Sequence, residues 1–180
     1  MTEEIIIAGF GGQGVLSMGK ILAYSGIMQG MEVTWMPSYG PEMRGGTANV
    51  TVILSSEPVS SPVLNQYDTV IALNQQSMDK FEPMIKPGGL LLYDNNGITR
   101  HPQRTDVKIY CVEAALEASK TDPRVFNMIV LGGYLAIRPI LTIENVIEGL
   151  KKSLPERHHA LIPLNKDAIY AGMKLIKEIL

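Results

Sequence analysis

The sequence has 180 residues, of which 46% are hydrophobic, and carries a formal net charge of −2 with a pI near 5.9. This length and apolar content suffice for one well-buried core and are short for two, so we expect residues 1–180 to form a single domain. Lys and Arg are scattered and do not outnumber the acids. The charge therefore argues against nucleic acid or an anionic membrane surface as the main partner.

The N-terminal segment MTEEIII places two acids before a short apolar run, the opposite of the basic-then-apolar order of a secretory signal. No apolar run approaches the roughly 20 residues that span a bilayer. Cys111 is the only cysteine, which excludes an internal disulfide and any cysteine-built metal or iron–sulfur site within this chain. We therefore expect a cytoplasmic protein with no membrane segment.

Apolar runs alternate with helical patterns along most of the chain. We predict six strands, at Ile5–Ala8, Val33–Met36, Ala48–Leu54, Thr69–Leu73, Gly89–Tyr93 and Val107–Val112. Helices are predicted at Val15–Met28, Gln75–Met84, Val112–Ser119, Val125–Ile137, Ile143–Ser153 and Lys166–Leu180. Because the strands are apolar on both faces, the pattern predicts a three-layer α/β/α domain with a mixed, mainly parallel sheet and a helix-rich C-terminus.

One connection breaks the alternation. Only about ten residues rich in Pro and Gly separate Val33–Met36 from Ala48–Leu54, too few for a helical crossover between parallel strands. These two strands therefore either pair antiparallel or lie apart in the sheet. We predict surface loops at Asn95–Asp106 and at Ser153–Asn165.

The stretch IIIAGFGGQGVLS joins the first strand to the first helix and satisfies G-x-G-x-x-G with Gly9, Gly11 and Gly14. In a dinucleotide-binding fold an acid at the end of the second strand binds the ribose. The second strand here has no acid at that end, since Glu32 precedes it, and Lys20 lies too late for a phosphate-binding P-loop. Three interpretations stay open: a nucleotide site, a loop that faces another protein chain, or glycines that only permit a sharp strand-to-helix turn and close packing against a neighbour.

A second glycine-rich loop, MPSYGPEMRGGTANV, follows the second strand. Both loops come after the carboxyl ends of strands, so we expect them to share one edge of the sheet, where open α/β folds bind ligands and partners. Arg44 offers a planar fork suited to a carboxylate or phosphate, and an ion pair with Glu42 or a surface acid is the alternative.

Four motifs in order carry a resemblance to a known family: GFGGQGV, PSYGPEMRGG, YDTVIALN and NMIVLGGYLA. Over nearly its whole length the chain resembles the gamma subunit of the 2-oxoacid:ferredoxin oxidoreductases, in particular the stand-alone subunits of 2-oxoglutarate and branched-chain enzymes. The resemblance implies a complex that oxidatively decarboxylates a 2-oxoacid to an acyl-coenzyme A and passes electrons to ferredoxin. Thiamine diphosphate, Mg²⁺ and iron–sulfur clusters would be held by other subunits, and this chain would carry no catalytic residue, metal or cofactor of its own.

The resemblance also implies partners and a contact surface. The partners would be the thiamine-binding alpha and beta subunits and a ferredoxin-like subunit, and 2-oxoglutarate is favoured as substrate ahead of branched-chain 2-oxoacids and pyruvate. The contact surface and active-site edge would be formed by the two glycine loops, with the residues Gly11, Gly12, Gln13, Gly14, Ser38, Tyr39, Glu42, Arg44, Gly45 and Gly46. In this interpretation Gln13 hydrogen-bonds a partner or substrate group, and Arg44 meets coenzyme A, a substrate carboxylate or a partner acid. A stand-alone nucleotide-binding enzyme remains the alternative.

Several single residues outside these loops also have an expected structural role. Cys111 lies in an apolar strand and is expected to be buried and structural. Asn127 is expected to cap the helix that follows it, and Thr142 to cap the next one. Trp35 and Tyr39 lie beside the predicted docking edge and are candidate interface residues.

Overall fold

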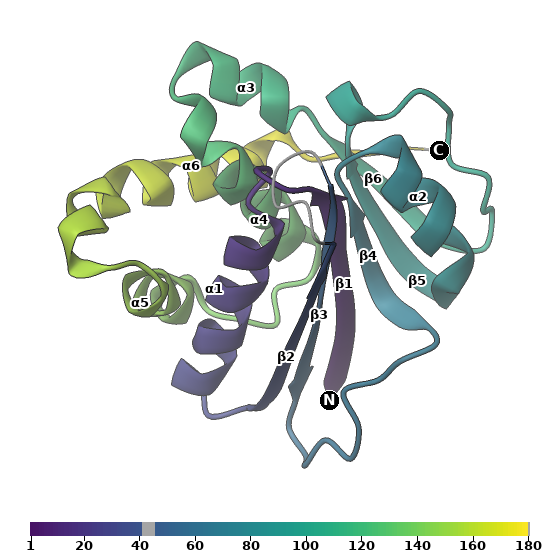
Figure 1. Ribbon diagram of the computed structural model, residues 1–180, viewed down its shortest axis with the longest axis horizontal. Helices are drawn as coiled ribbons and strands as arrows, with labels where there is room; N and C mark the ends of the chain where they lie inside the picture. The colour runs from purple at the N-terminus through teal and green to yellow at the C-terminus, as the bar shows by residue number, and fades with distance from the viewer. Residues whose placement is uncertain (41–45, 180) are drawn as a thin grey trace.

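The computed structural model describes residues 1–40 and 46–179. Its centre is one sheet of seven strands in the order β2-β3-β1-β4-β5-β6-β7 (Figure 1). The strands are β1 (Thr2–Phe10), β2 (Glu32–Tyr39), β3 (Thr47–Ser55), β4 (Tyr67–Ala72), β5 (Ile85–Asp94), β6 (Lys108–Val112) and β7 (Lys177–Glu178). All six predicted strands are present, and the two-residue β7 was not predicted from the sequence.

The sheet is mixed, as expected. Strands β1, β4, β5 and β6 run parallel to their neighbours in its centre, whereas the β2–β3, β3–β1 and β6–β7 pairs are antiparallel. Three of the six pairings among the described residues are thus parallel. The short Pro/Gly-rich connection joins an antiparallel pair, with Trp35 opposite Val52, which settles the alternative left open above.

Helices cover both faces of the sheet, and the helical layer on one face is thicker than the layer on the other (Figure 1). They are α1 (Val15–Met28), α2 (Gln75–Phe81), α3 (Ala114–Lys120), α4 (Phe126–Ile137), α5 (Ile143–Ser153) and α6 (Ile162–Leu175), with 3-10 turns at Glu82–Met84, Asn95–Gly97, Pro123–Val125 and Glu156–Leu161. On one face of the sheet, α1 and α4 lie on the strands, and α5 and α6 pack on their outer sides. On the other face α2 covers a smaller core that includes Met78 and Phe81.

Glycines set how closely the helices of the deep layer approach one another. A Cβ on Gly132 of α4 would collide with the Ile169 carbonyl of α6, and a Cβ on Gly172 of α6 would collide with the Ile129 carbonyl of α4. The two glycines therefore face each other's backbones across one crossing. Gly149 similarly brings α5 onto the backbone of α1.

Two sequence expectations at the C-terminal end were wrong, and the first is the helix Lys166–Leu180, because α6 runs from Ile162 to Leu175 and is followed by the strand β7. The segment Ser153–Asn165, expected to be a loop, contains the 3-10 turn Glu156–Leu161 and the first turn of α6. Pro163 lies in that first helical turn, where its missing N–H costs no hydrogen bond, and so it does not delay the helix. Thr142 caps α5 as expected, accepting a hydrogen bond from the Asn145 N–H.

No helix in the described part of the chain combines the length and apolar content that crossing a membrane requires.

Candidate functional site

The two glycine loops meet at one end of the sheet, as their position after strand ends predicts. The first follows β1 and leads into α1, and residues of the second lie between β2 and β3 (Figure 1). The Gly11 N–H donates a hydrogen bond to the Gly46 carbonyl over 2.8 Å. Glu42, Arg44 and Gly45 lie outside the described residues, so their predicted contacts stay predictions.

Between the loops lies a hollow of about 340 Å³, which we call the glycine hollow. It is lined by glycines and by uncharged side chains, three of them large, from both loops and from the first turn of α1: Phe10, Gly11, Gly12, Gly14, Val15, Leu16, Ser17, Tyr39, Gly46, Thr47 and Ala48. No acid, Lys, Arg or His lines it among the described residues. The glycine hollow therefore offers shape and backbone groups, and no pair of side chains for acid–base chemistry.

The backbone of the first loop depends on glycine at two positions. Gly12 has a φ of +99° with open space around its Cα, and Gly14 has a φ of +75° where it precedes α1. Both angles disfavour a side chain. The first turn of α1 has neither a side-chain cap nor an acid, so its free N–H groups give this end of the helix a partial positive charge.

The Gln13 amide is bonded within the chain. Its Oε1 accepts a hydrogen bond from the Phe10 N–H over 2.7 Å, and its Nε2 donates to the Leu73 carbonyl over 3.1 Å. The side chain thus ties the glycine turn to the end of β4. This geometry assigns Gln13 a bracing role within the fold, and the expected hydrogen bond to a partner or substrate is not needed to satisfy its amide oxygen.

Asn127 does not cap α4, contrary to expectation. The 3-10 turn Pro123–Val125 precedes the helix, so the N-cap position falls on Val125 and Asn127 is already the second helical residue. Its Nδ2 instead lies 3.4 Å from the Gly14 carbonyl, to which it donates. Asn127 therefore joins the start of α4 to the glycine loop, across more than a hundred residues of sequence.

The strand order separates the end of β2 from the glycine turn, unlike the arrangement that a dinucleotide-binding site requires. Strand β3 lies between β1 and β2, which places the end of β2 two strands, or about 10 Å, from the glycine turn. Glu32 begins β2 and therefore lies at the opposite end of the sheet from the loop. Within residues 1–40 and 46–179, no acid lies at the end of β2 in the position that binds ribose in a dinucleotide site.

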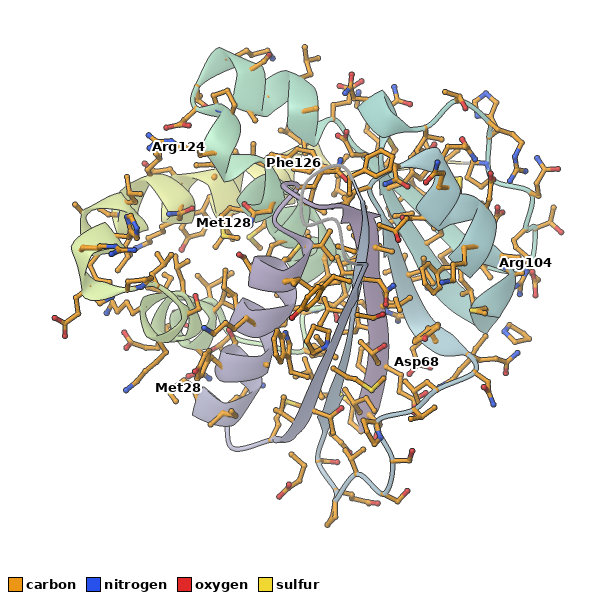
Figure 2. All side chains as sticks on the ribbon, viewed as in Figure 1. Met28, Asp68, Arg104, Arg124, Phe126 and Met128 are labelled. Carbon is orange, nitrogen blue, oxygen red and sulfur yellow. The ribbon has the colours of Figure 1, made fainter. Side chains whose placement is uncertain are left out.

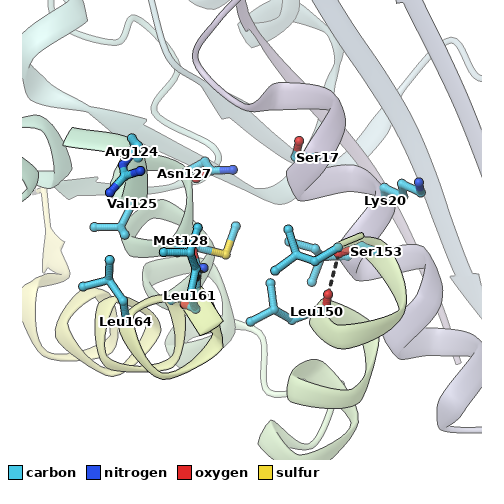
Figure 3. A pocket seen from close by; sticks show the side chains of 13 residues that line it. Ser17, Lys20, Arg124, Val125, Asn127, Met128, Leu150, Ser153, Leu161 and Leu164 are labelled. Atoms are coloured by element: carbon cyan, nitrogen blue, oxygen red, sulfur yellow. Dashed lines mark hydrogen bonds between the residues drawn. The ribbon is translucent and has the colours of Figure 1, made fainter. Parts of the chain in front are cut away.

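A second hollow, of about 300 Å³, lies between α1, α4, α5 and α6 (Figure 3). Its wall is mostly apolar, with Met128, Leu161 and Leu164 among the side chains drawn, and Lys20 and Arg124 lie on opposite sides of it. Arg124 pairs with Asp122, holding the pKa of that carboxyl down at about 2. Ser17 lines both hollows, so they are neighbours across the first turn of α1.

Asp94 is a residue near the loop that sequence reasoning did not single out. It ends β5, is 2% exposed, and lines a hollow together with Gly12 and Gln13. Burial raises the pKa of its carboxyl, and it accepts a hydrogen bond from the Ala115 N–H over 3.1 Å. An acid at the end of the buried run GGLLLYD is the signal that could have found it. Its observed contact supports the start of α3.

The potential metal ligands in the described part of the chain lie apart from one another. No three His, Cys, Asp or Glu side chains come together as metal ligands within residues 1–40 and 46–179. Cys111 is buried as expected, and burial raises the pKa of its thiol to about 11, which keeps it protonated near neutral pH. The residues present therefore do not fit an iron–sulfur cluster or a dedicated Mg²⁺ site.

Residues 4–175 match the family described as pyruvate ferredoxin/flavodoxin oxidoreductase. Ketoisovalerate oxidoreductase subunit VorA of Methanothermobacter thermautotrophicus is 37% identical over 97% of this chain, which spans only 36% of VorA. 2-Oxoglutarate synthase subunit KorC of Methanocaldococcus jannaschii is 33% identical, with 87% of this chain and 86% of KorC covered.

Solved structures agree in fold. The gamma subunit of a keto/oxoacid ferredoxin oxidoreductase from Geobacter sulfurreducens superposes with a TM-score of 0.82 at 30% identity, covering 97% of this chain and 96% of that one. The 2-oxoglutarate:ferredoxin oxidoreductase from Magnetococcus marinus, solved with 2-oxoglutarate, coenzyme A and succinyl-CoA bound, gives 0.86 at 25% identity, covering 97% of this chain and 31% of that one. The chain belongs to the pyruvate ferredoxin/flavodoxin oxidoreductase family, among the gamma-type subunits of 2-oxoacid:ferredoxin oxidoreductases.

Proposed function

We propose that residues 1–180 act as one domain, the gamma subunit of a multi-subunit 2-oxoacid:ferredoxin oxidoreductase in the cytoplasm. In the complex it completes the assembly and borders the active site with its two glycine loops. The observation that carries this proposal is the glycine hollow, where the described residues of two loops from different strands present four glycines, uncharged side chains and no acid–base pair. Such a surface suits close approach by another chain or a bound molecule and not catalysis of its own.

The cofactors of the reaction belong to the partners in this proposal. Thiamine diphosphate with Mg²⁺ and the iron–sulfur clusters would supply decarboxylation and electron transfer from the alpha, beta and ferredoxin-like subunits, with coenzyme A as acyl acceptor and ferredoxin as electron acceptor. The single, buried and protonated Cys111 supports this division, because a cluster needs several thiolate ligands.

We favour 2-oxoglutarate as the substrate, because the chain and the 2-oxoglutarate synthase subunit KorC match over most of both lengths. A branched-chain 2-oxoacid is the second candidate, favoured by the 37% identity to the ketoisovalerate subunit VorA. Turnover of the purified complex with each 2-oxoacid decides between them.

The test of the subunit role compares two glycines that share a conformation. Gly12 and Gly88 both have a positive φ and open space around them, but only Gly12 lies at the glycine hollow. We expect Gly12→Trp to lower complex assembly or turnover about tenfold or more, equivalent to roughly 1.4 kcal/mol. Gly88→Trp likewise places a side chain on a residue with a positive φ, away from the glycine hollow, and should leave both unchanged.

The isolated chain provides the second arm of this test. We expect it to show no oxidoreductase activity and no calorimetric binding of NAD, FAD or ATP. Micromolar binding of any of the three would overturn the proposal and favour a stand-alone nucleotide-binding enzyme.

A further inference from the structure

The four helices on the thicker side of the sheet pack as two close pairs. Gly149 brings α5 onto the backbone of α1, and Gly132 and Gly172 bring α4 and α6 against each other's backbones. The hollow of about 300 Å³ shown in Figure 3 lies between the two pairs and is lined by residues of all four helices. In that view Leu150 of α5 lies on one side of it and Met128 of α4 on the other. We call this space the helix hollow.

The helix hollow has an apolar wall and a polar exposed side. Met128 and Leu150 are 2% and 1% exposed. They belong to a set of apolar lining side chains from the four helices and the turns beside them: Ile21, Val125, Met128, Leu150, Leu154, Leu161 and Leu164. The lining residues that are exposed are Ser17, Lys20 and Arg124. Small-ligand sites combine such an apolar wall with a few polar groups, so this space suits a molecule with an apolar body and one polar end.

Positive charge lies at the exposed side of the helix hollow. Arg124 pairs with Asp122 through its Nε and Nη2, at 3.0 and 2.6 Å, and its Nη1 donates to no described residue. Figure 2 shows Arg124 among the outer side chains of the helical layer. Lys20 forms no ion pair within residues 1–40 and 46–179, and its Nζ lies 5.9 Å from the centre of the Tyr24 ring, on a flexible stem. Since no described acid lines the hollow, the polar end that fits it is an anion.

The uncharged polar side chains of the wall are already bonded within the chain. Ser153 Oγ donates to the Leu150 carbonyl and Asn165 Nδ2 donates to the Leu161 carbonyl, each over 2.8 Å, and Figure 3 marks the first of these bonds. These donors are engaged in holding their own helices. The polar end of a ligand would therefore meet mainly the cationic groups at the exposed side.

The volume of the helix hollow limits the size of its ligand. Its 300 Å³ corresponds to about ten water molecules at ~30 Å³ each. A ligand of about ten non-hydrogen atoms fills that space, which a carboxylate on an aliphatic chain of about eight carbons provides.

We propose that the helix hollow binds a small aliphatic carboxylate. Its chain packs against Met128, Leu150 and Leu164, and its carboxylate lies at the exposed side, where Lys20 and Arg124 supply the positive charge. This inference goes beyond the proposed function and does not depend on it, because all of the lining residues belong to this chain.

The experiment follows the binding of octanoate to the full chain by the NMR signals of isotope-labelled methionine methyl groups. Octanoate should shift the Met128 signal saturably and leave that of Met78, which is buried under α2 on the other face, in place. Met128→Leu and Met78→Leu assign the two signals. Butyrate, which lacks four methylene groups, should bind at least about tenfold more weakly. Octanamide has the same length and no charge, and should bind about fivefold more weakly.

Two pairs of variants test the charge and the space. Lys20→Ala should raise the octanoate Kd about fivefold. Lys80→Ala is its matched control and should leave the Kd unchanged, because Lys80 also lies on a helix, with its Nζ 5.0 Å from an aromatic ring, but on the other face of the sheet. Leu164→Trp fills the hollow and should abolish binding, whereas Leu116→Trp, at an exposed leucine outside it, should have no effect.

The wild-type chain alone is sufficient to overturn the inference. A Met128 signal that octanoate does not move, or that moves no more than the Met78 signal, shows that the hollow takes no such ligand. Equal affinity for octanoate and octanamide, or for wild type and Lys20→Ala, shows that the ligand is not an anion. Urea unfolding checks that each variant is folded. Complex assembly and turnover, which test the proposed function, are measured separately, so the two can fail independently.

Discussion

Glycines serve opposite purposes in two regions of this molecule. At the crossing of α4 and α6, Gly132 and Gly172 are enclosed, and any added carbon would strike the backbone of the opposite helix. At the glycine loop, a Cβ on Gly12 would meet no atom of the described residues within 4 Å, and the constraint on Gly12 is its positive φ. The residue type is the same, but one region uses its small size and the other its backbone freedom. The first region is closed to any partner, whereas the second is a surface.

Filling the space at the crossing of α4 and α6 should destabilise the fold strongly. Gly172→Ala should lower the free energy of unfolding by about 3 kcal/mol, because the new Cβ must displace the Ile129 carbonyl and with it a helix. For a domain of this size that corresponds to a Tm lower by roughly 6–12 °C.

Gly133→Ala is the matched control for the helix crossing. Its nearest neighbours, from Ile176 and Val112, would lie at ordinary contact distances of 3.4 and 3.6 Å. Alanine also favours the helix over glycine by about 1 kcal/mol, so Gly133→Ala should be neutral or stabilising. Equal losses for the two variants would contradict the crossing geometry.

Gly14 lies between the two extremes and should give the next largest effect. Gly14→Ala places a Cβ on a residue with a φ of +75° and brings it 2.6 Å from Asn127 Cγ. We expect a loss of about 2 kcal/mol in urea unfolding, from backbone strain and from displacement of the amide. In an Asn127→Gly background, which removes the clashing Cβ, Cγ and Nδ2 together, the same change should cost only the strain, about 1 kcal/mol. An undiminished loss there would mean that the Asn127 contact contributes nothing.

A buried tyrosine hydroxyl in the helix layer should have a smaller influence on the free energy of unfolding. The hydroxyl of Tyr134 on α4 is fully buried and has no hydrogen-bond partner among the described residues. Because an unsatisfied buried hydroxyl destabilises the folded state, Tyr134→Phe should raise the free energy of unfolding by about 1 kcal/mol. Tyr170→Phe, at a side chain that is 40% exposed, should change nothing measurable. A loss for Tyr134→Phe would instead reveal a partner such as an ordered water.

Local patterns were sufficient to predict most of the fold. The bounds of α1 and α5 match the prediction, because Gly14 and Thr142 mark their starts in the sequence itself. The predicted start of α6 is four residues late, and the observed first turn of the helix contains Pro163, a residue that this position accepts. The two residues of β7 are too few to produce a periodic pattern.

The location of the candidate site could be predicted from the sequence, but its side-chain contacts could not. The rule that strand ends meet at one edge brought the two glycine loops together correctly. The bonds of Gln13 to Leu73 and of Asn127 to Gly14 join residues 60 and 113 positions apart, which no local pattern encodes. The contact between Gly132 and Gly172 could not be predicted for the same reason, since the local sequence around each is that of an ordinary helical glycine.

The hydrogen bonds of the Gln13 amide affect the free energy with which a partner or ligand binds to the glycine loop. Its two hydrogen bonds fix the turn to itself and to the adjacent strand before any contact is made. A loop that is already ordered loses little conformational entropy on binding, and more of the contact energy is available as affinity. The backbone at Gly12 is thus presented as a rigid shape and not as a flexible chain, even though it carries no side chain at all.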